Sequence, residues 1–387
     1  MRIARVLTRL NLGGPARQAL AADAQLVARG HEVRLYAGTP LAGEGDLFDA
    51  FVERGLHVER VPGLGRGFTG VGDLRALSGL KARFRAFRPD VVHTHASKAG
   101  ALGRRAAASV PRAARVHTFH GHVLEGYFPE PVSRGLIALE TRLARETDRV
   151  IAVAHATAED LLRLQVVEER RLVVVPPGID IDPFLAIERR HGELRALVGA
   201  KPSDYLVGVV GRLAEVKQPE LALDVIGVLA QKYPRLQLVY VGDGELRGAL
   251  ERRIRALAPE LQARVHMVGV RTDMPAVLAD LDAVLLTSRN EGAPVALIEA
   301  AAAGKPAFAL SVGGVPELIA HERTGWLATS TDELAFGLAR FLDEPALTNG
   351  LAVRARLRVE KRNSASALAD RLADIYTRVV EERACAS

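Results

Sequence analysis

The stretch RIARVLTRLNLGGPARQALAADAQLVARGHEVRLYAG, residues 2–38, contains a complete strand, helix and strand pattern. The apolar run IARVL (3–7) is followed by a Gly-Gly loop and by a helical pattern that ends at Gly30, a suitable C-cap. The run HEVRLYAG (31–38) is typical of a second strand. Because strands that are joined through a helix run parallel, this stretch predicts an α/β fold with a parallel sheet.

The same alternation continues along the chain, with one interruption at RLVVVPPGIDIDPF (171–184). Prolines and a glycine there indicate a linker, and a polar helix is predicted over 186–197. We therefore expect two doubly wound, Rossmann-like domains, at 1–178 and 179–364, and an amphipathic helix at 365–387. Such sheets bind ligands at the carboxyl ends of their strands, so two facing sheets would form a cleft. The further candidate strands are HVERVP, DVVHTH, ARVHTFH and RVIAVA in the first half and YLVGVV, QLVYVG, ARVHMVGV, DAVLLTS, KPAFALS and GWLA in the second.

The composition of the 387 residues is that of a globular protein, with 48% apolar and 25% charged residues. Cys385 is the single cysteine, which excludes a disulfide framework and suits a reducing compartment such as the cytoplasm. The N-terminal apolar run is broken by Arg5 and Arg9, which disfavours a signal peptide. No apolar run approaches the roughly 18 residues of a membrane span.

The positive charge lies in the first half of the chain. Residues 1–180 contain 26 Lys and Arg against 19 Asp and Glu, a net charge of +7, whereas the remainder has −1. This asymmetry indicates an anionic partner such as an acidic lipid surface or a phosphate-bearing substrate, or else solvated arginines without a partner. The low aromatic content of 5% and the lack of a known motif argue against nucleic acid. The candidate membrane or acceptor surface consists of Arg66, Arg75, Lys81, Arg83, Arg85 and Arg88.

Two motifs of the second half each follow a predicted strand. In GRLAEVK (211–217), Gly211 ends the strand, and Arg212 and Lys217 precede a helix that opens at Pro219. Two cations beside a helix N-terminus form an anion site, although two exposed surface cations are the simpler reading. In VGDGE (241–245), Gly242 allows the backbone to approach a ligand or a neighbouring loop.

The Gly13-Gly14 loop follows the first strand, so its amides could face an anion. This loop matches neither the G-x-G-x-x-G fingerprint nor a P-loop, which disfavours a Rossmann dehydrogenase and an NTPase.

Five of the chain's 11 histidines are clustered in sequence at two predicted strand ends. Three interpretations are open: a metal site, one imidazole that serves a ligand, and purely structural histidines. The H-E-x-x-H pattern of zinc enzymes is absent, which disfavours the metal. The five are His93, His95, His117, His120 and His122.

The stretch NEGAPVALIEA (290–300) places one carboxylate in a loop and a second inside an apolar helix. Glu291 precedes the helix, for which Pro294 suits the first position, and Glu299 needs a partner because its burial is otherwise costly. Carboxylates accept hydrogen bonds from vicinal hydroxyls, so the pair could hold two sugars while the amides of Gly292 and Ala293 meet a phosphate. The alternative is one helix-capping and one salt-bridged glutamate.

Taken together, GRLAEVK, VGDGE, the E-x7-E of EGAPVALIE (291–299), SVGGVPELI (311–319), TGWL (324–327) and the Gly-Gly loop resemble the family-4 glycosyltransferases of the GT-B fold. The resemblance covers essentially the whole chain in order. HTFHGHVLEGYF (117–128) is similar, more weakly, to members that build bacterial surface polysaccharides.

The resemblance implies a role for each motif. Arg212 and Lys217 would bind the donor diphosphate, Glu299 the ribose, and Glu291 with Gly292, Ala293 and Pro294 the donor sugar. His120 would reach that sugar from the N-terminal domain, Gly14 would lie near the diphosphate, and Val270 and Arg271 near the base. The family retains anomeric configuration without a metal or other cofactor, and its C-terminal helix packs back on the N-terminal domain. Ala293 and Pro294 replace a bulkier residue and a glycine of many members, which leaves the donor sugar open.

We therefore expect a retaining, metal-independent transfer of a hexose or N-acetylhexosamine from a nucleotide sugar, with UDP as the expected nucleotide. The expected acceptor is a saccharide or a lipid-linked sugar in polysaccharide synthesis. The expected location is the cytoplasm, with the inner membrane face as a docking surface. Two alternatives are a sugar-nucleotide epimerase of similar build and a non-catalytic subunit that binds a nucleotide sugar.

Overall fold

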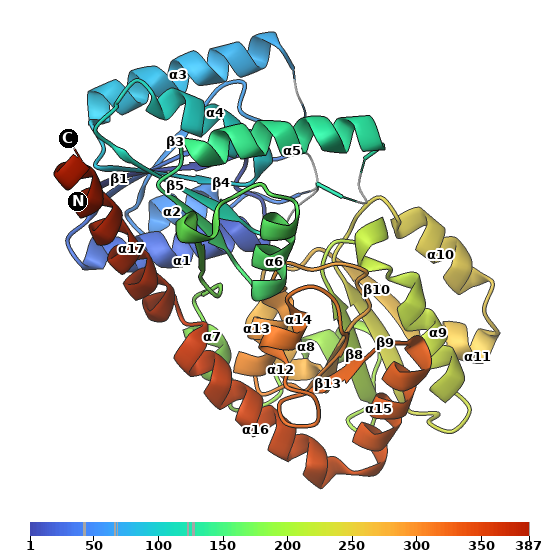
Figure 1. Cartoon of the computed structure of the whole chain (residues 1–387). Helices are drawn as coiled ribbons and strands as arrows, with labels where there is room; N and C mark the ends of the chain where they lie inside the picture. The colour runs from blue at the N-terminus through green and yellow to red at the C-terminus, as the bar shows by residue number, and fades with distance from the viewer. Residues whose placement is uncertain (42–43, 66, 68, 122–123, 126–127, 387) are drawn as a thin grey trace. The chain divides into compact units, whose positions relative to one another are not determined.

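The computed structural model describes residues 1–41, 44–65, 67, 69–121, 124–125 and 128–386 (Figure 1). The chain divides into two compact units. Unit 1 comprises Met1–Asp180 and Arg362–Ser387, and unit 2 comprises Ile181–Lys361. The limits expected from the sequence, 178 and 364, lie within a few residues of these. In the described part of the chain, no helix combines the length and apolarity that a membrane span requires.

Unit 1 is built on a parallel sheet of seven strands. One of these was not predicted: β7 (Leu172–Val174) pairs with β6, and Pro176 and Pro177 follow it directly, so the segment read as a linker also contains the last strand. In sheet order the strands are β3 (His57–Arg60), β2 (Glu32–Ala37), β1 (Arg2–Leu7), β4 (Val91–His95), β5 (Ala114–Phe119), β6 (Arg149–Ala152) and β7.

The helices of unit 1 cover both faces of this sheet (Figure 1). Because strand side chains alternate between faces, Ile3 packs with α1 and α17 whereas Ala4 and Val6 pack with α3 and α4. The helices are α1 (Gly14–Ala28), α2 (Phe48–Glu53), α3 (Val71–Phe87), α4 (Ser97–Ala107), α5 (Glu130–Arg145), α6 (His155–Arg163), the 3-10 turn η1 (Glu169–Arg171) and α17 (Ala365–Ala386).

The C-terminal helix α17 belongs to the core of unit 1. Its apolar stripe of Leu368, Leu372, Ile375 and Val379 is buried with Ile3 and other residues of the sheet. The helix lies beside α1 (Figure 1). Burial of several large aliphatic side chains, at about 1.5–3 kcal/mol each, holds this last segment on the sheet although it is distant in sequence.

Unit 2 has a parallel sheet of six strands, and all six were predicted. Its core is apolar, with Leu238, Tyr240 and Leu285 from the sheet packed against α9 and α15. In sheet order the strands are β10 (Val265–Gly269), β9 (Leu236–Val241), β8 (Tyr205–Val210), β11 (Ala283–Leu286), β12 (Ala307–Leu310) and β13 (Trp326–Ala328).

The polar helix predicted over 186–197 is formed only in its last part, as α8 (Glu193–Leu197), and α7 (Asp182–Leu185) ends before the predicted start. Gly192, at a φ of 87°, precedes α8. The carboxylate of Asp280 accepts from the amides of Gly192 (2.6 Å) and Leu194 (2.8 Å), which caps this helix at its start. The helices are α7 (Asp182–Leu185), α8 (Glu193–Leu197), the 3-10 turn η2 (Glu215–Lys217), α9 (Glu220–Leu229), α10 (Arg247–Arg255), α11 (Pro259–Gln262), α12 (Met274–Asp280), α13 (Val295–Ala302), α14 (Val315–Leu318), α15 (Thr331–Asp343) and α16 (Pro345–Arg362), which ends at unit 1.

Candidate functional site

The two sheets share one topological feature, a point where the strand order reverses. In unit 1 the chain runs outward from β1 in one direction and from β4 in the other, and in unit 2 from β8 and β11. The crevice at the carboxyl ends of such a strand pair is the usual ligand site of an open parallel sheet. The residues singled out in the sequence fall largely at these two points.

In unit 2 the loops after adjacent strands are joined by backbone hydrogen bonds. The amide of Gly211, after β8, donates to Val241 (3.0 Å), and the amide of Gly242, after β9, donates to Gly269 (2.8 Å). Leu213 donates to Asp243 (2.9 Å). The strand ends from β8 to β10 are therefore one continuous rim.

Glycine is required at two points where these loops approach each other. A Cβ on Gly242, whose φ is 144°, would lie 1.9 Å from the carbonyl oxygen of Gly211. A Cβ on Gly313, whose φ is 49°, would lie 2.0 Å from the carbonyl oxygen of Glu291. No side chain fits at either distance, so these glycines serve loop packing, whatever ligand the rim holds.

Arg212 and Lys217 follow β8, at the reversal point. The guanidinium of Arg212 is half exposed, and its nearest carboxylate, Glu245, is 3.7 Å away. Lys217 ends the turn η2, and Gln218 follows it in the left-handed conformation (φ 43°) before Pro219 caps α9. The segment therefore presents one loosely paired cation and one lysine just ahead of a helix N-terminus.

The segment of Lys217 is bound to the loop that follows β11, across the reversal point. Lys217 Nζ lies 2.5 Å from Glu291 Oε1, and the hydroxyl of Ser288 donates to the same oxygen at 2.6 Å. The hydroxyl of Thr287 donates to the carbonyls of Lys217 (3.1 Å) and Gln218 (2.9 Å). The predicted phosphate-binding lysine and the predicted sugar-binding glutamate thus bind each other.

The two glutamates of the E-x7-E motif differ in environment. Glu291 lies in the loop, with its carboxylate mostly covered, and Glu299 is buried within α13. Pro294 is the N-cap of α13, so the helix begins one residue later than predicted, at Val295. Gly292 and Ala293 precede it and are partly exposed. Two partly exposed residues therefore lie between Glu291 and the start of α13.

The two residues predicted near the base lie at the end of β10. Val270 is 45% exposed. The guanidinium of Arg271 is held by both carboxylate oxygens of Asp273, at 2.8 and 2.5 Å. This ion pair raises the pKa of Arg271 and lowers the pKa of Asp273.

In unit 1 the loop after β1 leads directly into α1. Gly13 is the N-cap and Gly14 the first residue of α1, whose first turn has no acidic side chain. Gly13 donates to the side chain of Asn11 at 3.3 Å. The start of a 15-residue helix thus lies at the reversal point of unit 1, directly after the Gly-Gly loop.

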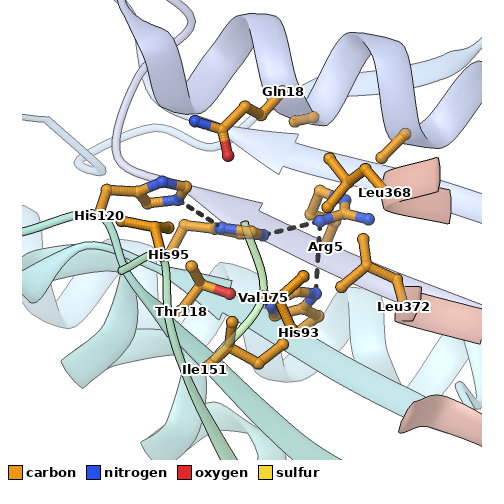
Figure 2. A pocket seen from close by; sticks show the side chains of 13 residues that line it. Arg5, Gln18, His93, His95, Thr118, His120, Ile151, Val175, Leu368 and Leu372 are labelled. Atoms are coloured by element: carbon orange, nitrogen blue, oxygen red, sulfur yellow. Dashed lines mark hydrogen bonds between the residues drawn. The ribbon is translucent and has the colours of Figure 1, made fainter. Parts of the chain in front are cut away.

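His120 follows β5 and is the last, partly buried member of a chain of hydrogen-bonded polar side chains that begins at the buried Arg5 (Figure 2). Arg5 Nη1 lies 2.8 Å from His95 Nε2, and His95 Nδ1 lies 2.9 Å from His120 Nε2. Burial and the charge of Arg5 lower the pKa of His120 to about 3, so its imidazole is neutral at pH 7. Burial is also the main cause that holds the pKa values of His93, His95 and His117 well below their usual range.

These histidines do not share one environment. His93 and His95 point to the face of α1 and α17, whereas His117 lies on the other face and bonds Thr94 (2.8 Å). His122 lies outside the described residues. Among the residues that the structure describes, no group of three His, Cys, Asp or Glu side chains could hold a metal ion.

Sequence reasoning missed the residues that hold this histidine chain in place. Arg5 and Asp23 form an ion pair of 2.7 Å, and both side chains are almost fully buried. Tyr376, on α17, bonds His93 at 2.6 Å. An arginine between Ile3 and Leu7 on the inward side of a predicted central strand was the available signal, because a buried charge needs a partner.

The basic segment is mostly the exposed face of α3. Arg75 and Arg85 are exposed on the helix, Lys81 is partly exposed, and Arg88 is its left-handed C-cap (φ 51°). Arg83 differs, because Glu59 binds it at 2.9 Å. Arg66 lies outside the described residues. Within the part of the chain that the structure covers, Arg75, Lys81, Arg85 and Arg88 have no carboxylate partner.

Comparisons with known proteins agree with this arrangement. The family model Glycosyltransferase Family 4 matches residues 12–183, and Glycosyl transferases group 1 matches residues 192–375. A relative from Escherichia coli, UDP-Gal:alpha-D-GlcNAc-diphosphoundecaprenol alpha-1,3-galactosyltransferase, is 28% identical over 87% of each chain. The D-inositol 3-phosphate glycosyltransferase of Actinosynnema mirum is 30% identical over 77% of this chain and 73% of its own.

Solved structures show the same fold. The Anabaena protein HepE, in complex with UDP and glucose, has a TM-score of 0.80 at 22% identity, over 98% of this chain and 100% of its own. Sucrose-phosphate synthase from Thermosynechococcus elongatus has a TM-score of 0.82 at 22% identity, over 99% and 100%. The family models and the curated relatives favour a glycosyltransferase over a sugar-nucleotide epimerase. The chain belongs to the family-4 glycosyltransferases, and its two Rossmann-like sheets are those of the GT-B fold.

Proposed function

We propose that this glycosyltransferase moves a hexose or N-acetylhexosamine from a UDP-linked donor to a lipid-linked saccharide, with retention at the anomeric carbon and without a metal. The observation that carries the proposal is the Lys217–Glu291 ion pair at the reversal point of unit 2, with the half-exposed Arg212 in the same loop. This arrangement supports the proposal, because two cations suit a diphosphate and a neighbouring carboxylate can accept hydrogen bonds from sugar hydroxyls.

In the reaction, the bond between the sugar C1 and the diphosphate oxygen breaks, and a bond from C1 to the acceptor oxygen forms. Negative charge builds on the β-phosphate as its bond to C1 breaks, and the departing diphosphate oxygen takes the proton of the acceptor hydroxyl. Arg212 and Lys217 would stabilise this charge, which is the task a metal ion performs in other transferases. The diphosphate would compete with Glu291 for Lys217 and so leave the Glu291 carboxylate available to the donor sugar.

We propose further donor contacts from both units. Glu299 would accept from the ribose hydroxyls, the loop of Gly292 and Ala293 would face the sugar, and Val270 with Arg271 would flank the base. From unit 1, Gly14 would contribute its helix N-terminus and His120 a hydrogen bond to the sugar. UDP is favoured because the E. coli relative is named for a UDP-sugar and HepE was solved with UDP.

The acceptor proposal rests on α3. Its exposed side carries Arg75 and Arg85 together with Val71 (81% exposed) and Leu74 (69% exposed). The one acid of the first turn, Asp73, is neutralised by Lys98 at 2.6 Å. Aliphatic side chains beside unpaired cations suit the interface of an anionic membrane, where a lipid-linked acceptor would be found. The E. coli relative is named for an undecaprenol-linked acceptor.

Calorimetric titration with UDP, GDP and ADP in EDTA tests the donor site. We expect micromolar binding of UDP, lost in Lys217→Ala and retained in Lys232→Ala, whose exposed ion pair with Asp343 lies in the same unit. Absence of binding for all three nucleotides would overturn the proposal. The anomeric configuration of the product, read by NMR from UDP-hexose and UDP-N-acetylhexosamine donors, then tests retention.

A further inference from the structure

We propose that Arg5 is a positioning residue that sets the tautomer of His120, so that His120 presents its Nδ1–H, and not a lone pair, to its ligand. The proposal rests on the role of His120 in the proposed function. It follows from the direction of each hydrogen bond in the chain Arg5–His95–His120, which we call the relay (Figure 2).

The direction starts at Arg5, because a guanidinium has only donors. His95 Nε2 must therefore accept from Arg5 Nη1 at 2.8 Å. A neutral imidazole has one N–H, so the proton of His95 stands on Nδ1. That N–H donates to His120 Nε2 at 2.9 Å, which leaves the single proton of His120 on Nδ1.

The free end of the relay is the atom that matters for a ligand. Both ring nitrogens of His95 are bonded, and so is Nε2 of His120. Nδ1 of His120 is buried and has no hydrogen-bond partner among the described residues. A buried N–H without a partner is costly, and a ligand oxygen would satisfy it.

A second set of hydrogen bonds, from Arg5 through His93, also runs from donor to acceptor away from Arg5. His93 Nδ1 accepts from Tyr376 (2.6 Å) and lies 3.3 Å from Arg5 Nη1, so its proton stands on Nε2, which donates to Thr118 at 2.8 Å. Each of these contacts is consistent with one neutral tautomer per ring. No bond in the network requires two donors or two acceptors to face each other.

Arg5 is itself fixed. Its Nε donates to Asp23 at 2.7 Å, and its Nη2 donates to the hydroxyl of Tyr376 at 3.3 Å. Arg5, His95 and His120 line a small cavity of about 20 Å³, enough for roughly one water molecule. The low pKa of His120, about 3, keeps the ring neutral, which the tautomer argument requires.

The consequence concerns what His120 can do. An Nδ1–H donor binds an oxygen lone pair of a sugar hydroxyl or a phosphate, and it cannot take a proton from an acceptor hydroxyl. In unconstrained histidine the other tautomer, Nε2–H, predominates, so the relay holds the less common form. Preorganisation of this kind orients a donor before the ligand arrives.

The direct test is NMR of the full chain labelled with ¹⁵N-histidine, at pH 7 and without substrate, with the His120 signals assigned by their loss in His120→Asn. We expect a protonated Nδ1 and an unprotonated Nε2 in His120. A protonated Nε2, or a doubly protonated ring, would overturn the proposal. The measurement needs no activity, so it stands apart from the donor-site titration, in which lack of nucleotide binding would sink the proposed function alone.

Variants test whether the relay causes the tautomer. His95→Leu removes the link, and we expect His120 to shift toward Nε2–H. Arg5→Met with Asp23→Asn removes the first donor without leaving a buried carboxylate unpaired, and we expect the same shift. His117→Leu is the matched control, because it removes a buried imidazole of the neighbouring strand from the other face of the sheet. An unchanged tautomer in folded His95→Leu, or an equal shift in His117→Leu, would overturn the role of the relay.

Kinetics complete the test. We expect His95→Leu to lower kcat/KM for sugar transfer about tenfold, as for one lost hydrogen bond, with the affinity for UDP unchanged. A shifted tautomer with unchanged kcat/KM would show that the orientation of this proton does not serve the reaction.

Discussion

The two sheets reverse their strand order in the same way, yet the side chains at the two reversal points differ. In unit 1, Arg5 of β1 lies beneath α1 and α17. Its side chain is 1% exposed and bonds to Asp23 and to two histidines of β4. Between β8 and β11, unit 2 keeps its strands apolar and places its charges in the loops, where Arg212 is 46% exposed.

This difference separates two ways of holding a polar group. A buried network has fixed donors and acceptors, and it loses much stability when one member is removed. A pair at a loop is worth little to stability, and its members can exchange partners when an anion binds. Unit 1 is therefore suited to fix the direction of one hydrogen bond, and unit 2 to release Lys217 to a diphosphate.

The largest expected effect comes from breaking the buried pair. Arg5→Leu leaves the Asp23 carboxylate buried and unpaired, and we expect a loss of about 3–5 kcal/mol in the free energy of unfolding of unit 1. Hydrogen exchange of peptides from each unit measures where protection is lost. The sole tryptophan, Trp326, lies in the core of unit 2, so its fluorescence reports the other unit in the same sample.

Arg212→Ala is the counterpart in unit 2, and we expect its stability to change by no more than about 0.5 kcal/mol. Asp23→Leu added to Arg5→Leu should recover much of the lost stability, because no charge is then left unpaired. Equal losses in Arg5→Leu and Arg212→Ala would remove the contrast between the units.

The next effect is on activity. Lys217→Ala removes a cation that would face the leaving diphosphate, and we expect kcat to fall by roughly 10²–10³-fold, about 2.7–4 kcal/mol, by analogy with one oxyanion-hole donor. Steady-state transfer from the UDP-sugar that binds measures it, with Lys232→Ala as the control. An unchanged kcat in both Lys217→Ala and Arg212→Ala would contradict the electrostatic role.

The sequence predicted the strands of both units except β7, because period-2 apolar runs bounded by glycine and proline are strong local signals. It also placed Arg212, Lys217 and Glu291 at strand ends. It could not show that Lys217 and Glu291 bind each other, since they are 74 residues apart. The Arg5–Asp23–Tyr376 network was missed for the same reason, because its partners come from β1, α1 and α17.

A smaller effect is expected on the stability of the protein at acidic pH. The pKa of His120 in the folded chain is about 3, below the roughly 6.5 of an unfolded histidine, so the stability it contributes is complete above about pH 6.5 and is lost as pH falls toward 3. Between pH 7 and pH 5 we expect this one group to account for at most about 2 kcal/mol of lost stability. Urea unfolding at both pH values, in wild type and His120→Asn, measures the difference.

Asp23 changes the stability in the direction opposite to His120 as the pH falls. Burial raises its pKa to about 6, against the attraction of Arg5, so protonation below pH 6 relieves part of its burial cost. This contribution is present in both proteins and cancels in the comparison. The same loss of stability at pH 5 in wild type and in His120→Asn would show that His120 is not held neutral.

The smallest effect is at the surface of unit 1, where single exposed cations act on a membrane. Arg75→Ala should weaken co-sedimentation with anionic vesicles by about 1 kcal/mol, roughly fivefold, and raised salt should weaken wild-type binding as well. Arg255→Ala, an exposed arginine of unit 2, is the matched control. Binding to neutral vesicles as strong as to anionic ones would contradict the electrostatic docking of α3. Equal effects of Arg75→Ala and Arg255→Ala would instead mean that the net charge of the protein, and not this helix, attracts it to lipid.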